Sequence, residues 1–163
     1  MDFSILMSNP IINVCVISWC SAQLIKTLLT FIKYKKFDKS RLSGSGGMPS
    51  SHSAVVCSVT LTCFLIYGFS SAIFAIAFVV AFIVMYDAIG VRWAAGLHAK
   101  AINNIVEYLD GHENINKKEL NSLIPKLNES LGHRKIELVC GAFLGFFIAL
   151  LTQVIVPFIQ QLI

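Results

Sequence analysis

The chain has 163 residues, of which 56% are hydrophobic and 13% are charged, and its formal net charge is +4. A soluble domain carries about a quarter charged residues, so this composition excludes an ordinary soluble globular protein and indicates a membrane protein. The length accommodates a single domain over residues 1–163. All five cysteines lie in apolar stretches without a CxxC pair, which favours small buried side chains over a metal site or a disulfide framework.

Four apolar segments are long enough to cross, or nearly cross, a hydrocarbon core that needs about 20 helical residues. They are residues 10–32, 53–69, 71–91 and 136–159. The second is the shortest, and we expect it to be tilted or partly immersed. A tight turn around Gly68 predicts that the second and third segments form an antiparallel hairpin. The N-terminus lacks a basic region and a small-residue cleavage site, so the first segment is expected to be retained as a span.

The basic residues give the orientation of these spans. All thirteen lysines and arginines lie near or after the end of the first span, or between the third and fourth spans, and a four-span path places both groups on one side. The positive-inside rule makes that side the cytoplasm. We therefore expect an integral protein of a bacterial plasma membrane with both termini outside. The same basic face is also compatible with binding of an anionic soluble partner or of acidic lipid headgroups.

Two helical hydrophobic patterns fill the segment between the third and fourth spans. The first covers residues 94–109 and the second covers residues 120–131. They predict amphipathic helices that lie under or between the spans, the second bent at Pro125 and ended by Gly132. The expected fold class is all-α: an integral membrane helical bundle with about four membrane-embedded helices and two amphipathic helices on the cytoplasmic side.

A glycine-rich turn, SGSGGMPSSHSA, comes directly before the second span. Gly46 and Gly47 let backbone N–H groups approach a ligand without a Cβ in the way. Ser50 and Ser51 fall at the N-terminus of a helix, where unpaired N–H groups and the helix dipole favour phosphate. His52 is placed to give a proton to a departing oxygen. The alternative interpretation is a well-capped helix with an incidental interfacial histidine.

The stretch LGHRKIE marks the start of the fourth span. His133 and Glu137 are four residues apart, so on a helix they share a face and the carboxylate orients the imidazole. That arrangement leaves one ring nitrogen to act as a nucleophile. The alternative is a histidine in a cap region beside an interfacial glutamate.

A third polar stretch runs from Asp87 to Asn103. An acid inside a membrane helix usually faces protein and has a partner. Arg92 is the nearest candidate, although a separation of five residues turns it away from Asp87 on a regular helix, and its planar guanidinium also suits phosphate oxygens. Arg92, Gly96, Ala99 and Asn103 form a small-residue stripe that allows close packing with a polar contact. All three stretches fall at one membrane depth, and this convergence is the main functional signal.

Together, these stretches resemble the divergent type-2 phosphatidic acid phosphatase family, which is related to acid phosphatases and vanadium-dependent haloperoxidases. The resemblance covers nearly the whole chain and rests on the motifs GGMPSSHSA, YDAIGVR and LGHRKIELVCGAFLG. It implies a helical phosphatase that needs no metal or other cofactor. By this resemblance, His133 attacks phosphorus to give a phosphohistidine and His52 protonates the leaving oxygen. Ser50 and Ser51 would hold phosphate, and Glu137 replaces the usual aspartate.

The chain departs from the wider superfamily in its cations. An Arg-Pro phosphate motif is missing before the Pro-Ser loop, and Leu127 stands where an arginine is expected before the nucleophilic histidine. A phosphoryl group in transfer needs such charges for stabilisation. Lys26 and Arg41 are loose candidates for the first charge, and Arg92 or Lys126 is the candidate replacement for the second.

Two functions follow from these residues. The first is a phosphoric monoester or anhydride hydrolase acting on a lipid phosphate or pyrophosphate at the cytoplasmic leaflet, with Arg92 and the loop amides on the phosphate oxygens and Asp87 and Asn103 in support. The second is a non-catalytic membrane protein that binds anionic headgroups or assists lipid handling. A third function, as a transporter or channel subunit, has weaker support, because a single acid near one membrane face makes no continuous polar path. Expected partners are membrane lipids and a phosphorylated lipid substrate. No nucleic acid partner is expected, and the sequence is also compatible with a homo-oligomer.

Overall fold

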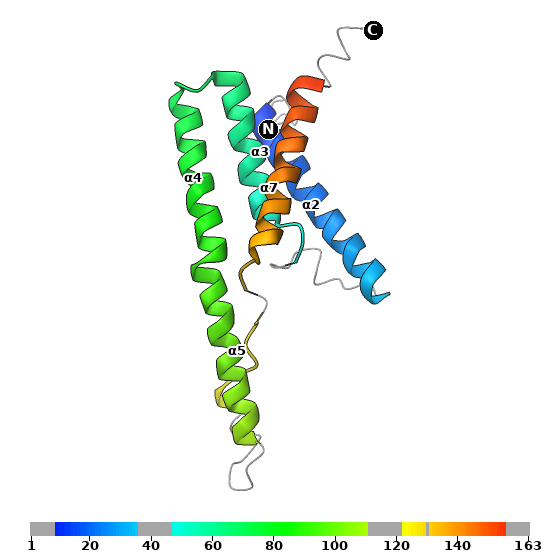
Figure 1. Ribbon diagram of the computed structural model, residues 1–163, viewed down its shortest axis with the longest axis vertical. Coiled ribbons are helices and arrows are strands. Elements are labelled where there is room, and N and C mark those ends of the chain that lie inside the picture. The colour runs from blue at the N-terminus through cyan, green and yellow to red at the C-terminus, as the bar shows by residue number, and fades with distance from the viewer. Residues whose placement is uncertain (1–8, 36–46, 111–121, 130, 156–163) are drawn as a thin grey trace, which may run out of the picture.

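The computed structural model describes residues 9–35, 47–110, 122–129 and 131–155. These residues form helices and connecting loops with no strand among them, which confirms the expected all-α membrane bundle. In chain order the elements are α2 (Pro10–Tyr34), α3 (Ser51–Tyr67), α4 (Ala72–Ile89), α5 (Val91–Asp110), α7 (Lys135–Leu150) and a short π-helical continuation, η2 (Leu151–Ile155) (Figure 1).

Three of the described helical stretches are long and apolar enough to span a membrane. They are Pro10–Lys33, Ala72–Asp110 and Lys135–Val154, and they match the predicted first span and most of the predicted third and fourth spans. The last residues of the predicted fourth span, 156–159, lie outside the described residues. Helix α3 is apolar but has only 17 residues. It is therefore about 25 Å long against a hydrocarbon core of about 30 Å, in agreement with the expectation that the second span is the shortest.

Local sequence signals set the ends of these helices. Asn9 caps α2 by accepting hydrogen bonds from the N–H groups of Ile11 and Ile12 at 3.0 and 3.3 Å. The predicted hairpin between α3 and α4 forms at Gly68, whose φ of +78° suits glycine. The Ser71 side chain then caps α4. A short polar turn therefore reverses the chain between two apolar helices.

Helix α3 lies at the centre of the bundle and packs against α2, α4 and α7. Its contact with α7 is the closest, because Gly141 and Gly145 leave no room for a side chain. A Cβ at Gly141 would overlap the carbonyl oxygen of Ser50, and a Cβ at Gly145 would overlap that of Ala54. This GxxxG spacing is typical of helix pairs in membranes. It fixes the start of α3 beside the start of α7.

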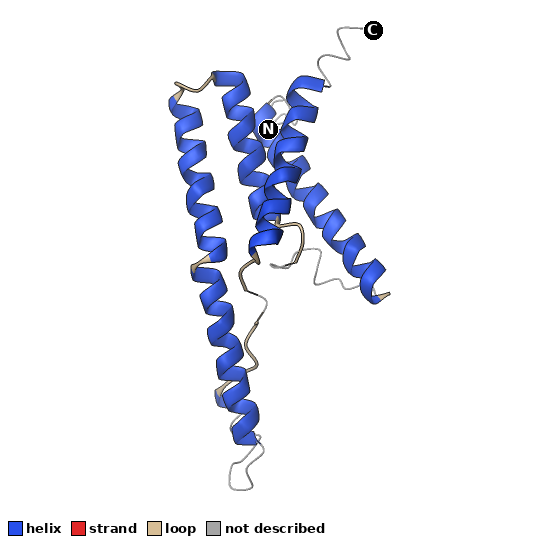
Figure 2. Cartoon of the chain, viewed as in Figure 1, coloured by secondary structure: helices blue, strands red, loops and turns tan. Residues whose placement is uncertain are grey.

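Helix α5 continues the line of α4 and extends beyond the rest of the bundle, with a loop at Gly90 between them (Figures 1 and 2). The prediction that residues 94–109 form a helix is confirmed, but the prediction that this helix lies under or between the spans is wrong. Gly90 adopts φ −100° and ψ −90°. This break rotates the side chains of α5 about the helix axis relative to those of α4, but it does not fold α5 back beneath the bundle.

The second predicted amphipathic helix, residues 120–131, is wrong over its described C-terminal part. Residues 125–129 are not helical, because Pro125 has no N–H to donate and disfavours helix in the residue before it. The backbone of Leu127 instead bonds to the Asn103 side chain in both directions, at 3.0 and 2.9 Å. The segment therefore runs along α5 rather than forming its own helix.

The sequence predicted that Gly132 would be a helix C-cap, and this prediction is wrong. Gly132 has φ +80° in the loop before α7, and a Cβ there would overlap the backbone of Trp93 at the start of α5. The loop and α5 therefore touch backbone to backbone. This contact, the start of α3 and the start of α7 lie at one end of the bundle, opposite the start of α2 and the end of α7 (Figure 1).

Candidate active site

A small polar pocket lies where α3 and α7 start, where α4 ends and where α5 begins. Its wall contains the two histidines, the acid and the arginine that the sequence singled out from three separate stretches. Its lining residues are His52, Val84, Asp87, Ala88, Arg92, Gly132 and His133.

The two histidine rings meet across this pocket. Their centroids are 6.3 Å apart, with an angle of 58° between the ring planes. His133 is buried, with 4% of its surface exposed, whereas His52 is exposed. The predicted convergence of His52 and His133 is therefore present in the fold, while their catalytic roles stay predictions.

His133 is held on two sides. Its backbone N–H donates to the carbonyl oxygen of Ala88 at 3.0 Å, and its Nδ1 lies 3.2 Å from Oε2 of Glu137. The same carboxylate oxygen accepts from the backbone N–H of Arg134 at 3.2 Å, in a capping box at the start of α7. When Nδ1 carries the proton and donates to Glu137, the lone pair is left on Nε2, the nitrogen required for attack on phosphorus.

The serines of the Pro-Ser loop lie beside the pocket rather than in its wall. Ser50 is fully buried and caps α3 by accepting from the N–H of Ser53 at 3.3 Å. Its own backbone N–H donates to the carbonyl oxygen of Glu137 at 3.0 Å. Ser51 is also buried, and its Oγ accepts from Nζ of Lys26 at 3.4 Å. These serines therefore join α2, α3 and α7 directly beneath His52.

The glycine-rich turn is described only in part. Gly47 has φ +83°, and a Cβ on it would lie 3.5 Å from the aliphatic stem of Lys26. Gly46 lies outside the described residues, and so does Arg41. Gly47 therefore packs over the lysine and does not line the pocket.

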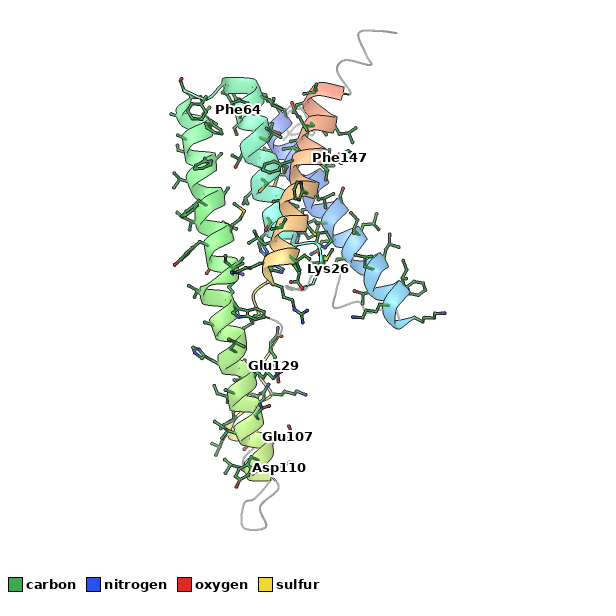
Figure 3. The ribbon with its side chains drawn as sticks, in the orientation of Figure 1. Lys26, Phe64, Glu107, Asp110, Glu129 and Phe147 are labelled. Carbon is green, nitrogen blue, oxygen red and sulfur yellow. The ribbon has the colours of Figure 1, made fainter. Side chains whose placement is uncertain are left out.

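Lys26 is a buried candidate residue that the sequence indicated only loosely, as one of four replacements for the missing cations. It is 2% exposed and reaches from α2 to Ser51 at the start of α3 (Figure 3). A lysine inside an apolar helix is costly to bury and usually marks a site. Its position between Ile25 and Thr27, eight residues before the end of α2, was the signal that could have identified it.

Arg92 pairs with Asp87, which corrects the expectation that five residues of separation would turn it away. Nε of Arg92 donates to Oδ2 of Asp87. The expectation assumed a regular helix, but the chain breaks at Gly90 between α4 and α5. The side chains of Arg92 and Asp87 are 52% and 34% exposed, so the pair lies at the open side of the pocket.

Asn103 lies on α5, away from the pocket. It bonds to the backbone of Leu127 and, through its amide nitrogen, to Oε1 of Glu129 at 2.8 Å (Figure 3). A Cβ at Gly96, two stripe positions earlier, would lie 2.6 Å from the carbonyl oxygen of Leu131. The small-residue stripe therefore holds the segment that leads to His133, and it supports the site indirectly.

The charges around the pocket favour an anion. His52 precedes the apolar segment 53–69, and its pKa is lowered below the ordinary value. The causes are partial burial first, then the positive charge of Arg92, then His133 and Lys26, with Asp87 opposing them. An anion bound beside the ring would offset the part of this shift that comes from the positive charges, and it would therefore favour the protonated form of His52.

Comparisons with known proteins agree with the motifs. A family model described as the divergent PAP2 family matches residues 7–148. The chain is also 38% identical over 133 residues to a protein of Bacillus subtilis (strain 168), the uncharacterized membrane protein YuiD, which covers 79% of this chain and 84% of that relative. No solved structure matches the chain.

Proposed function

This chain belongs to the divergent PAP2 family, and from that premise we propose that it is a membrane-bound phosphatase. It hydrolyses a lipid phosphate or pyrophosphate through a phosphohistidine intermediate. The observation that carries the proposal is the pairing of His52 and His133 across one pocket, with Glu137 against Nδ1 of the buried ring. Membership of the family alone would not identify the reaction.

The reaction proceeds in two steps. Nε2 of His133 attacks phosphorus while the bond to the leaving oxygen breaks, and His52 gives that oxygen its proton. Water then attacks the phosphohistidine, His52 takes a proton from this water, and the phosphorus–nitrogen bond breaks to release phosphate and free His133. Glu137 stabilises the positive charge on the His133 ring in the first step, as a carboxylate partner does in other histidine mechanisms.

Lys26 and Arg92 replace the cations that the chain lacks relative to the wider superfamily. Lys26 extends from α2 and donates a hydrogen bond to Ser51, and Arg92 extends from α5 and donates one to Asp87. Both charges act on His52 and are therefore close enough to act on a phosphate beside it. The pocket-bearing end of the bundle faces the cytoplasm of a bacterial plasma membrane in this proposal, and the start of α2 faces outside.

A second candidate function is binding of anionic headgroups without turnover. One observation favours it: Arg92 already pairs with Asp87, so part of its charge is neutralised before any phosphate arrives. In that case the protein would bind phosphate or vanadate, but no phosphorus–nitrogen bond would form.

Phosphate release from a panel of lipid phosphates and pyrophosphates, by the protein purified in detergent, tests the first function against the second. We expect release by the wild type and a loss of at least about a thousandfold in His133→Ala, as for removal of a nucleophile elsewhere. His98→Ala is the matched control, since His98 is an exposed histidine on α5 outside the pocket wall. Full activity in His133→Ala would exclude this mechanism.

A further inference from the structure

The face of α3 that carries His52 continues as an apolar stripe. Val56, Val59 and Cys63 follow His52 at intervals of four, three and four residues, so they lie on the same side of the helix. All three line an apolar groove between α2, α3 and α4. The polar pocket and this groove therefore lie end to end along one face of α3.

Helix α4 has the same arrangement. Val84 lines the polar pocket, while Val80, Ala77 and Ile73 line the groove. Their spacing of four, three and four residues again places them on one face of the helix. Because α3 and α4 are antiparallel neighbours, the two stripes face each other from the histidines to the far end of the hairpin.

The groove has the length and chemistry of a lipid chain site. All its lining residues are apolar: Ile11, Val55, Val56, Val59, Cys63, Ile73, Ile76, Ala77 and Val80. From His52 to Cys63 the helix rises about 16 Å, which is close to half of a hydrocarbon core of about 30 Å. The polar pocket and the groove together therefore extend over about one leaflet.

A second apolar cavity, between α3, α4 and α7, does not continue the polar pocket in this way. Its α3 residues are Cys57 and Thr60. At about 100° per residue, Cys57 is turned roughly 140° away from His52. A chain that begins at a phosphate beside His52 would have to cross α3 to enter that cavity.

We propose that the groove between α2, α3 and α4 holds the hydrocarbon chain of the lipid whose phosphate binds at His52 and His133. This inference rests on the proposed function. It narrows the substrate class to lipid phosphates in which one hydrocarbon chain, about one leaflet long, lies along α3 and α4. Lipid tails are as apolar as the groove, so the bilayer competes equally for the chain. The groove therefore positions the phosphate and selects for chain shape, and it adds little affinity.

The test uses hexadecyl phosphate with a photoreactive diazirine on its last carbon, added to full-length protein in nanodiscs. Mass spectrometry of the labelled peptides locates the end of the chain. With this probe we expect label near Cys63 and Ile73. With the octyl phosphate analogue we expect label one or two helical turns from His52, near Val56 and Val80. A hexadecanol probe, which lacks phosphate, should not give this pattern.

Ala77→Phe places a ring in the groove and should lower hexadecyl labelling of these sites about tenfold, as overpacking of a filled site does. Ala75→Phe is the matched control, because Ala75 is an exposed alanine on the same helix outside the groove, and it should leave labelling unchanged. Label on Phe78 and Phe82, or label spread over the lipid-facing side of α4, would overturn the proposal.

The same preparation separates failure of the groove from failure of the phosphatase. The wild type is assayed for phosphate release from unmodified hexadecyl phosphate, and His133→Ala is labelled in parallel so that turnover does not consume the probe. Turnover without groove labelling would remove the chain site and leave the phosphatase. Groove labelling without turnover would support the chain site and favour the headgroup-binding function instead.

Discussion

The two walls of the pocket hold their side chains differently. On the α7 side, His133 is buried and fixed by Ala88 and Glu137, and the glycines of α7 press that helix against α3. On the α4–α5 side, Asp87 and Arg92 form one partly exposed pair beside a helix break. A nucleophile needs a fixed direction of attack, and a cation stabilises a transition state best when it is preorganised and not already neutralised by a partner. We therefore expect variants of the fixed wall to cost more activity than variants of the exposed wall.

The largest effect is expected at Glu137 in the fixed wall. Glu137→Gln keeps the shape of the side chain but turns an acceptor-only carboxylate into an amide that can donate to Nδ1. That change favours the wrong tautomer of His133 and should lower kcat about a thousandfold. Phosphate release in single turnover measures it. An activity within threefold of the wild type, about 0.7 kcal/mol, would show that the carboxylate does not orient the ring.

A smaller loss is expected at Lys26. Lys26→Met keeps the aliphatic stem and removes the buried charge, so kcat/KM should fall about a hundredfold, as when one donor to the transition state is removed. The melting temperature should stay the same or rise, because burying a charge is costly. Lys33→Met, on the exposed end of the same helix, is the control. Equal losses in both variants would point to a general surface-charge effect.

The smallest loss is expected at Arg92 in the exposed wall. Arg92→Gln should lower kcat/KM about tenfold, since an exposed, already paired charge contributes little. Arg92 also lowers the pKa of His52, so its removal should raise that pKa. Because His52 must be protonated to act as an acid, activity falls as pH rises through this pKa, and the fall should move to higher pH in the variant. Lys100→Gln, elsewhere on α5, should leave the pH profile of kcat/KM in place.

The sequence predicted what depends on long apolar runs and on short-range spacing. The three spans, the α3–α4 turn and the pairing of His133 with Glu137 all follow from contiguous residues. Arg92 was correctly named as the nearest partner for Asp87, but the geometry of the pair depends on the backbone angles of Gly90, which the sequence does not give. The second amphipathic helix was misassigned over residues 125–129, because its leucines have helical spacing while Pro125 and the distant Asn103 determine the backbone there.

One sequence feature was not interpreted, and a second was named only as a loose candidate. Gly141 and Gly145 form a GxxxG motif, which would have predicted the close contact of α3 with α7. Lys26 interrupts an apolar helix, which would have predicted a buried functional charge. The contact of Gly132 with Trp93, by contrast, joins residues far apart in the chain and needed the folded backbone.

The most direct test of the central claim is to trap the intermediate. The protein is mixed with a lipid phosphate labelled with ³²P in its phosphate group, quenched in base, where phosphohistidine survives, and digested so that the labelled peptide can be sequenced. We expect label on the peptide containing His133, absent in His133→Ala and chased out by unlabelled substrate. Steady turnover with no label on that peptide, or with label on another residue, would contradict the account.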